Sequence, residues 1–278
     1  MTDSSLVSQL LSDQGHDGRI LFHPYHKWRG AHWVLACLAE IGHPPGDERL
    51  RPLLEQCYEW LLSQEHAKYI RQIAGRTRRC TSQEGNCVYY SLALGLADER
   101  TQELAERLMK WQWPDGGWNC DKRPEAAVSS FHETWIPLRA LALYGRASGD
   151  PAAARAVERA ADVFLKRQLF RRLRGGAVIE HTFVELFFPF YWHYNILAAL
   201  KVMGEAGFLS DPRCAPALDL LESKRLPDGG FPAETCFYRR TRPEVNGYSP
   251  VDWGGVSKRR ANPFITADAQ RVLQMAGR

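Results

Sequence analysis

Two kinds of helix-forming segment alternate along this chain, and the alternation constrains the fold more than any other feature. Segments of the first kind are amphipathic with one charged face, which is typical of helices exposed to water on one side: 48–64, 101–113, 151–168 and 212–224. Segments of the second kind are apolar around nearly their whole circumference: 26–41, 86–97, 130–147 and 189–206. Such helices must be buried on all sides. No window shows a sustained period-two alternation, so we expect an all-α protein, with further helices over 5–13 and 264–276.

A glycine stands at the end of each apolar segment. The glycines are Gly42, Gly95, Gly145 and Gly204, and Gly277 ends the last helix. The position after a helix C-terminus often takes a left-handed backbone, which favours a residue without a Cβ atom. Helix pairs that cannot bury their own apolar faces must stack on copies of themselves. The pattern, at a period of roughly fifty residues, predicts one domain over 1–278: an α/α ring of inner and outer helices, with the inner N-termini at one end.

Composition narrows the class of protein. Of the 278 residues 45% are apolar, which is enough for a substantial core, and 36 basic against 32 acidic side chains leave a net charge of only +4. We therefore expect no nucleic-acid partner. The seven cysteines include no C-x-x-C pair, which favours a reducing cytoplasm over a disulfide framework, and no apolar run is long enough for an integral membrane segment. Nine Trp, ten Tyr, twelve Phe and nine His predict an aromatic-lined cavity, because buried indoles and phenols need polar partners.

A family resemblance rests on the turns between the helices. Leu108, Gln112 and the segment 116–118 resemble the QW motif of squalene-hopene cyclases and related triterpene cyclases, and 228–231 resembles a degraded second copy. The segment 116–135 is also similar to the Gly-Gly turn and inner helix of protein prenyltransferase β subunits. The resemblance implies an α/α toroid and an apolar, isoprenoid or polyketide-like substrate. The family toroid has six helix pairs, whereas about five are apparent here, so an incomplete or narrowed ring is expected.

The sequence departs from both families at their chemical groups. The Asp-x-Asp-Asp general acid of the class II cyclases occurs nowhere. Of the prenyltransferase zinc ligands, His132 matches the His and Cys87 the Cys, but Gly85 stands where the Asp belongs. We therefore expect no cofactor and no resident metal. The alternative metal site is a cluster of His132, His181 and His193, whose spacing matches no established ligand motif.

The closing glycines also bring candidate site residues into register. One set lies thirteen residues upstream of Gly42, Gly145 and Gly204 and consists of Arg29, His132 and Tyr191. A second set lies ten residues upstream of the same glycines and consists of His32, Trp135 and Tyr194. Residues three apart on a helix share a face, and buried His and Arg need partners or a ligand. The register predicts that all six converge on one cavity at the mouth of the ring. The alternative is that they cap helices or bond loop carbonyls.

Proton transfer needs an acid or imidazole with a tuned pKa. The predicted catalytic residues are His132, Glu133, Asp121 and His32. For Asp121 the alternative is a solvated pair with Lys122 or Arg123. The predicted substrate-binding residues, several of which would stabilise a cationic intermediate with their ring faces, are Arg29, Trp33, Cys87, Tyr90, Trp135, Tyr191, His193, Tyr194 and Trp253.

Two further features bear on the ligand. Cys87 and Cys120 are the predicted reactive thiols, and the linker 232–262, which contains Trp253, is predicted to fold over the cavity as a lid. Arginines gather in the connections, and their planar fork suits phosphate and carboxylate groups. A small apolar substrate with an anionic group is therefore the expected partner.

The predicted function is a terpene cyclase- or prenyltransferase-like enzyme that works by acid/base or cation-stabilised chemistry. Two alternatives stay open. The first is a polysaccharide or uronate lyase or hydrolase, because such enzymes also have α/α barrels, in which Tyr, His and Arg act beside a uronate. A wide, open cleft would favour this alternative. The second alternative is a non-catalytic toroid that binds a hydrophobic ligand. Detection of turnover would exclude this alternative.

Overall fold

The computed structural model describes residues 4–278, and that part of the chain is mostly helical. Its α-helices are α1 (Ser4–Leu10), α2 (Ala31–Glu40), α3 (Arg51–Leu61), α4 (Gln64–Ala67), α5 (Ser82–Ala93), α6 (Glu99–Trp111), α7 (Phe131–Ser148), α8 (Pro151–Leu165), α9 (Ile196–Glu205), α10 (Ala215–Glu222) and α11 (Pro263–Met275). Two small antiparallel sheets, which the sequence analysis did not predict, pair β1 (Arg71–Ile73) with β2 (Arg76–Arg78) and β3 (Pro232–Ala233) with β4 (Ser257–Ala261). No helix within residues 4–278 has the length and apolarity needed to cross a membrane.

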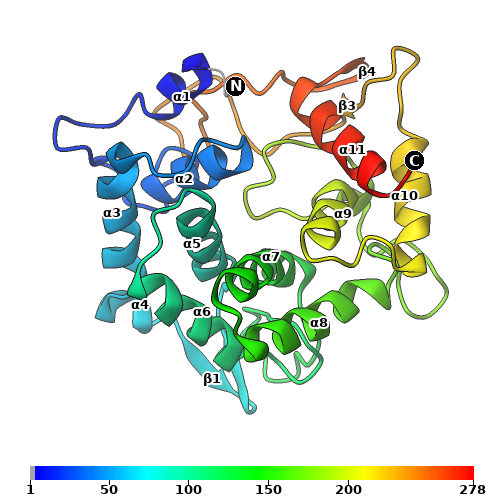
Figure 1. Ribbon diagram of the computed structural model, residues 1–278, viewed down its shortest axis with the longest axis horizontal. Coiled ribbons are helices and arrows are strands. Elements are labelled where there is room, and N and C mark those ends of the chain that lie inside the picture. The colour runs from blue at the N-terminus through cyan, green and yellow to red at the C-terminus, as the bar shows by residue number, and fades with distance from the viewer. Residues whose placement is uncertain (1–3) are drawn as a thin grey trace.

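Inner and outer helices alternate along the chain. In Figure 1 α3, α8 and α10 lie at the periphery, whereas α5, α7 and α9 lie nearer the centre. Helix α5 contacts α2, α6 and α7, and α9 contacts α7, α10 and α11. Helix α6 buries a single stripe, whereas α7 buries residues on every side, from Phe131 to Tyr144. The two kinds of segment seen in the sequence therefore correspond to two layers of helices.

Three predicted helices begin at the wrong residue. The segment 189–206 is helical only from Ile196, because the Asn195 side chain accepts a hydrogen bond from the Ala198 amide at 2.8 Å and caps the helix there. Helix α2 begins at Ala31 rather than at residue 26. Helix α5 begins at Ser82, four residues before the predicted start. Apolar periodicity located these helices but not their first turns.

The closing glycines were assigned correctly for three helices and wrongly for two. Gly42, Gly95 and Gly277 have φ values of 72°, 67° and 72°, the left-handed conformation that glycine adopts without penalty. Gly145 and Gly204 instead lie inside α7 and α9. The left-handed glycines after those helices are Gly149 (φ 71°) and Gly207 (φ 85°). The register taken from Gly145 and Gly204 is therefore displaced by about one helical turn.

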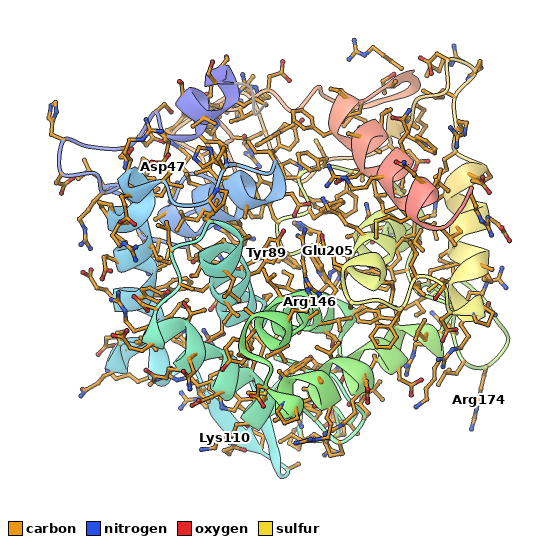
Figure 2. The ribbon with its side chains drawn as sticks, viewed as in Figure 1. Asp47, Tyr89, Lys110, Arg146, Arg174 and Glu205 are labelled. Atoms are coloured by element: carbon orange, nitrogen blue, oxygen red, sulfur yellow. The ribbon has the colours of Figure 1, made fainter. Side chains whose placement is uncertain are left out.

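A buried ion network joins the inner helices. Arg139 on α7 binds Glu205 on α9 at 2.6 Å and Glu40 on α2 at 2.5 Å, and its guanidinium lies 3.8 Å from the Tyr89 ring centroid on α5. Lys201 on α9 also bonds Glu40. Burial works to raise the pKa of Glu40, but the two cations outweigh it and hold that pKa at about 2. Figure 2 places Tyr89 and Glu205 near the centre of the molecule, so the network lies where the inner helices meet.

Candidate functional site

A cavity of about 440 Å³ lies where the loop before α2, the end of the β1–β2 hairpin and the loop before α7 come together. We call it the Tyr25–Trp60 cavity. Its lining combines rings with cationic and thiol groups: His23, Tyr25, His26, Trp60, His66, Tyr69, Arg78, Arg79, Cys80, Gln83, Cys120 and Lys122. This size and this mixture of apolar surface with a few polar groups are typical of small-molecule sites.

Aromatic side chains form one wall of the cavity. The Tyr25 and Trp60 ring centroids are 5.5 Å apart, and His66 meets Trp60 edge-on at 4.8 Å. Burial raises the pKa of Tyr25 to about 12, so its phenol is neutral at ordinary pH. The wall therefore offers ring faces without adding a negative charge.

His32, one of the predicted catalytic residues, lies behind this wall. Its ring contacts Tyr25 and Trp60, with centroids 5.7 and 5.6 Å away, and its Nδ1 is 3.3 Å from the Tyr90 hydroxyl. His32 is fully buried, and its Nε2 has no hydrogen-bond partner in the part of the chain that the structure describes. Burial lowers the pKa of His32 to about 3, so the imidazole is neutral.

The polar wall contains a buried ion pair. Arg79 donates from Nε to the Glu84 carboxylate at 2.8 Å and from Nη2 to Gln83 at 2.6 Å. Glu84 is fully buried, and His66 lies 3.3 Å from the same carboxylate oxygen. Burial tends to raise the pKa of Glu84, but Arg79 and His66 lower it more. The contacts that Arg79 and His66 make with Glu84 both use Oε1 and hold Arg79 at the edge of the cavity, whereas Glu84 Oε2 has no hydrogen-bond partner within residues 4–278.

Arg78 differs from its neighbour because no carboxylate among residues 4–278 forms an ion pair with it. It is only 1% exposed, donates from Nη1 to the Ala126 carbonyl at 2.8 Å and lies 4.4 Å from the Trp113 ring centroid. Within residues 4–278 its Nε and Nη2 have no hydrogen-bond partner. A buried guanidinium normally has its donors satisfied, so these two nitrogens need an explanation.

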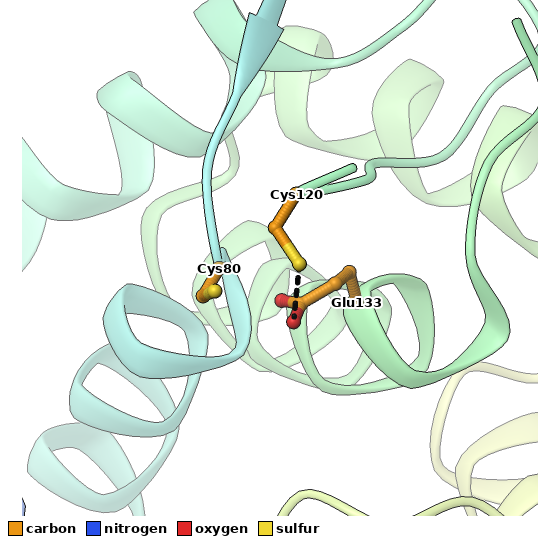
Figure 3. Close-up of side chains that lie close together, drawn as sticks. All are labelled: Cys80, Cys120 and Glu133. Atoms are coloured by element: carbon orange, nitrogen blue, oxygen red, sulfur yellow. Dashed lines mark hydrogen bonds between the residues drawn. The ribbon is translucent and has the colours of Figure 1, made fainter. Parts of the chain in front are cut away.

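Two thiols and a carboxylate meet beside the cavity. The ligand atoms of Cys80, Cys120 and Glu133 all lie within 4.8 Å of one another (Figure 3), and Cys120 donates to Glu133 Oε1 at 3.6 Å. The Ser82 amide donates to the other carboxylate oxygen at 3.0 Å. Burial raises the pKa of Glu133, and a hydrogen bond with Cys120 together with burial raises that of Cys80. This is the one group of three in residues 4–278 whose donor atoms could hold a metal ion.

The predicted proton-transfer residues are dispersed. Glu133 belongs to the group just described, whereas His132, its neighbour on α7, accepts a hydrogen bond from the Tyr194 amide at 3.1 Å and packs edge-on against Trp192. Asp121 pairs with Arg123 at 2.5 Å, which lowers the pKa of that carboxyl to about 2. The solvated ion pair considered as the alternative for Asp121 is thus the arrangement that the structure shows.

The six residues predicted to converge do not line one cavity. Arg29 pairs with Asp13 at 2.5 Å, and the Tyr194 hydroxyl donates to the Leu169 carbonyl at 2.5 Å. Trp135 and Tyr191 line a space of only about 20 Å³ between α2, α5 and α7. None of the six is among the residues that line the Tyr25–Trp60 cavity. Arg29, Tyr191 and Tyr194 precede α2 and α9, so a helical register counted from the closing glycines does not set their height, and Gly145 is four residues short of the glycine that ends α7.

Several of the predicted substrate-binding residues instead pack in a continuous aromatic layer. Tyr191 stacks on Trp28 with centroids 3.7 Å apart and meets Trp33 edge-on at 5.7 Å. His193 stacks between Trp192 and Phe237 at 4.0 and 3.6 Å. Burial lowers the pKa of His193 to about 3. The layer fills the space that the sequence analysis assigned to a ligand.

A second cavity, of about 690 Å³, adjoins this layer. His193, Lys27 and Trp28 line it together with residues of the segment 236–247. That segment belongs to the predicted lid, 232–262. Trp253, from the same linker, is fully buried and donates to Ser249 Oγ at 3.0 Å rather than facing either cavity.

Two other predicted groups are separated from any site. Cys87 is fully buried and its Sγ lies 4.0 Å from the Ser91 hydroxyl. His181 has a side chain that is 84% exposed and lies 3.4 Å from Glu185. In residues 4–278, His132, His181 and His193 form no group of metal-ligand atoms.

The sequence analysis missed most of the cavity lining. Trp60 lies inside the predicted helix 48–64, Tyr25 lies just before the predicted helix 26–41, and Cys80 precedes a helix whose start was placed at residue 86. A usable signal was present, since an Arg-Arg-Cys run at 78–80 ends one connection and Cys120 follows the Gly-Gly turn in the next. No protein-family model and no curated protein matches the chain. Its function must therefore be argued from the site.

Proposed function

We propose that the protein is an enzyme with an α/α toroid fold that acts on a small molecule with an apolar body and an anionic group, bound in the Tyr25–Trp60 cavity. The toroid is supported by the alternation of inner and outer helices and by the ion network, in which α2, α7, α9 and α11 meet through Glu40, Arg139, Lys201 and Asp268. In the proposed ring these helices would stand around a common axis, with the network between them.

Arg78 is the observation that carries the proposal. A guanidinium is charged at any ordinary pH, and a buried charge without a partner costs several kcal/mol. Arg78 lines the cavity, is 1% exposed and keeps two nitrogens without partners. A phosphate or carboxylate would accept from such a fork, and Lys122, also in the lining, adds a second positive charge.

The rest of the cavity suits the apolar body of the ligand and its chemistry. Tyr25 and Trp60 present ring faces that bind hydrocarbon and attract a positive charge developing on it. His23, another lining residue, has its pKa lowered mainly by burial, which keeps its imidazole neutral and able to accept a proton at pH 7. The residues thus supply anion binding, apolar contact and proton transfer in one place.

The free space among the inner helices argues that the substrate binds at the mouth of the ring rather than at its centre. Between α2, α5 and α7 this space is about 20 Å³, and a cavity of about 290 Å³ at α2, α9 and α11 is lined by the charged groups Glu40, Arg139, Lys201, Glu205 and Asp268. A long polyene would lie against these charges there, whereas the Tyr25–Trp60 cavity offers about 440 Å³ beside aromatic rings. A short isoprenoid or similar amphiphile fits the mouth, and prenyl transfer or cyclisation of a short substrate is the chemistry we propose.

Calorimetric binding of three probes tests the proposal: geranyl diphosphate, geraniol and inorganic diphosphate. We expect geranyl diphosphate to bind at least about tenfold more tightly than either fragment, since both walls then contribute. Arg78→Met should abolish the preference for the diphosphate ester over the alcohol. Arg71→Met is the matched control, because exposed Arg71 faces Arg78 across the β1–β2 hairpin.

Three outcomes would contradict the proposal. They are equal binding of ester and alcohol by the wild-type protein, an unchanged preference in Arg78→Met, and binding of none of the three probes. Turnover of an oligouronate by a protein that binds no geranyl diphosphate would favour the lyase alternative instead.

A further inference from the structure

Three connections that are distant in sequence bring Cys80, Cys120 and Glu133 together. Cys80 ends the connection into α5, Cys120 follows the Gly-Gly turn after α6, and Glu133 lies in the first turn of α7. Their ligand atoms lie within 4.8 Å of one another. From these donors we infer that the protein binds one zinc ion, or a similar thiophilic divalent cation, through Cys80 Sγ, Cys120 Sγ and a carboxylate oxygen of Glu133.

The local backbone holds the three side chains in place without a ligand. The Arg79 amide donates to the Asn119 carbonyl at 3.3 Å, which ties the two cysteine-bearing segments together. The Thr81 hydroxyl donates to the Glu133 carbonyl at 2.9 Å, and the Ser82 amide holds Glu133 Oε2 at 3.0 Å. Oε1 is left to face Cys120. A preorganised set of donors is what a metal site requires.

The distances fit a tetrahedral ion. With Zn–S of about 2.3 Å and Zn–O of about 2.0 Å, tetrahedral ligands stand about 3.5 Å (S to O) and about 3.8 Å (S to S) apart. The Cys120 Sγ to Glu133 Oε1 distance is 3.6 Å. The 4.8 Å bound on the whole group leaves a contraction of about 1 Å at most on metal binding, which side-chain rotation supplies.

The chemistry of the donors selects the metal. Two thiolates suit zinc and other thiophilic ions and disfavour magnesium and calcium, whose ligands are oxygens. On binding, both thiols lose their protons to solvent, so the site carries two thiolates and one carboxylate against the +2 ion. The Arg79 guanidinium, which also pairs with Glu84, acts electrostatically on both Cys80 and Glu133 and offsets part of the remaining negative charge.

The fourth position of the ion would open toward the Tyr25–Trp60 cavity. Cys80 and Cys120 both line that cavity. Three protein ligands and one open position are typical of catalytic rather than structural zinc. The ion would then polarise a ligand oxygen or bind a ligand thiol or water at the cavity floor. The sequence analysis predicted no metal from Gly85, Cys87 and His132, the positions that correspond to the prenyltransferase zinc ligands. Cys80 and Glu133 are not among those positions.

The test is elemental analysis of the full-length protein, purified under reducing conditions and then dialysed after incubation with ZnCl₂. We expect one zinc per chain. Cys80→Ser and Cys120→Ser should lower zinc affinity by at least about 100-fold, since changing even a group that supports a ligand costs about 10–100-fold. Cys236→Ser, a half-buried cysteine outside the group, is the matched control and should retain zinc.

A spectroscopic readout keeps the test independent of activity. The Co²⁺-substituted protein should show thiolate-to-metal charge transfer and the strong visible bands of a tetrahedral site, both absent in Cys120→Ser. Substoichiometric zinc after ZnCl₂ treatment would overturn the inference, as would retention of zinc in both cysteine variants or a Cys80–Cys120 disulfide in the reduced preparation. None of these measurements depends on the cavity ligand, so the failure of this inference and of the proposed function can be told apart.

Discussion

The ammonium of Lys201 lies 2.8 Å from Asp268 Oδ1 and also binds Glu40, so one side chain of α9 joins α11 to α2. These helices are remote in sequence, and the shared cation holds them together in the interior. Lys201 is 8% exposed, and a buried cation in such a place is tolerated only because two carboxylates pair with it.

Removal of this cation should destabilise the protein strongly. Lys201→Met leaves Glu40 and Asp268 buried with less positive charge, and we expect the free energy of unfolding to fall by about 3–5 kcal/mol. Urea denaturation followed by circular dichroism measures it. Lys166→Met, which removes a 58%-exposed lysine paired with Asp162, is the control and should cost less than about 1 kcal/mol. A loss of similar size in the two variants would show that the network does not unite the helices.

Acid should destabilise the protein before its carboxylates titrate. The pKa values of His32 and His193 are lowered to about 3, mainly by burial, below the unfolded value of about 6.5. The unfolded chain therefore binds more protons below pH 6.5, and stability falls as the pH drops from 6.5 toward 3. Each histidine should cost about 2 kcal/mol at pH 5.

Denaturation at several pH values between 7 and 5 checks this behaviour. His32→Leu should reduce the slope of the free energy of unfolding against pH by at most about half, because His193 contributes as much and the pKa values of His23 and His132 are lowered as well. The control His181→Gln removes an exposed imidazole and should leave the slope unchanged. A slope that is the same in all three proteins would show that the buried histidines become protonated in the folded state.

The Gly-Gly turn should tolerate no side chain at its second glycine. A Cβ atom at Gly117 would lie 2.5 Å from Thr134 Oγ1 and 2.7 Å from Ser129 Cβ, so Gly117→Ala forces the turn away from α7. We expect a loss of about 1–3 kcal/mol in thermal unfolding and weaker zinc binding, because Cys120 follows the turn. Gly145→Ala, whose Cβ would meet Ala153 at 3.3 Å, should be nearly neutral in both. If Gly117→Ala is destabilised but binds zinc with unchanged affinity, the turn does not position Cys120 for metal binding.

Trp60 should contribute to binding of the apolar body of the ligand. Trp60→Leu removes a ring that faces Tyr25 and His66, and we expect geranyl diphosphate to bind roughly tenfold more weakly in calorimetry. Inorganic diphosphate, which lacks the hydrocarbon, should bind as before. Trp192→Leu is the control, since Trp192 lies in the layer near His193 and outside the cavity lining. A larger loss in Trp192→Leu would move the site to the second cavity.

The helical layers were predictable because burial imposes its own pattern on a helix. The charged face of α6 and the burial of α7 on every side follow directly from which sides meet water. The register of the helices was less predictable. Both Gly145 and Gly149 are compatible with a helix end, and only packing decides that α7 continues to Ser148.

The cavity was beyond sequence reasoning for a related reason. Most of its lining comes from loops and the end of a β-hairpin, where periodicity gives no signal, and Trp60, His66 and Gln83 are added from α3, α4 and α5. These residues meet only through tertiary contacts. Glu133 and Cys120 were singled out for proton transfer and reactivity, but their partner Cys80 could be found only once the start of α5 was known. His132, the neighbour of Glu133, belongs to the aromatic layer because successive residues of a helix face different directions.

The central claim is that the Tyr25–Trp60 cavity, rather than the larger cavity beside His193, binds the ligand. A crystal structure of the full-length protein with geranyl diphosphate tests it most directly. The account predicts diphosphate density at Arg78 and Lys122 and hydrocarbon density along Tyr25 and Trp60. Ligand density in the cavity lined by Lys27, Trp28 and His193, with the Tyr25–Trp60 cavity left to solvent, would contradict it.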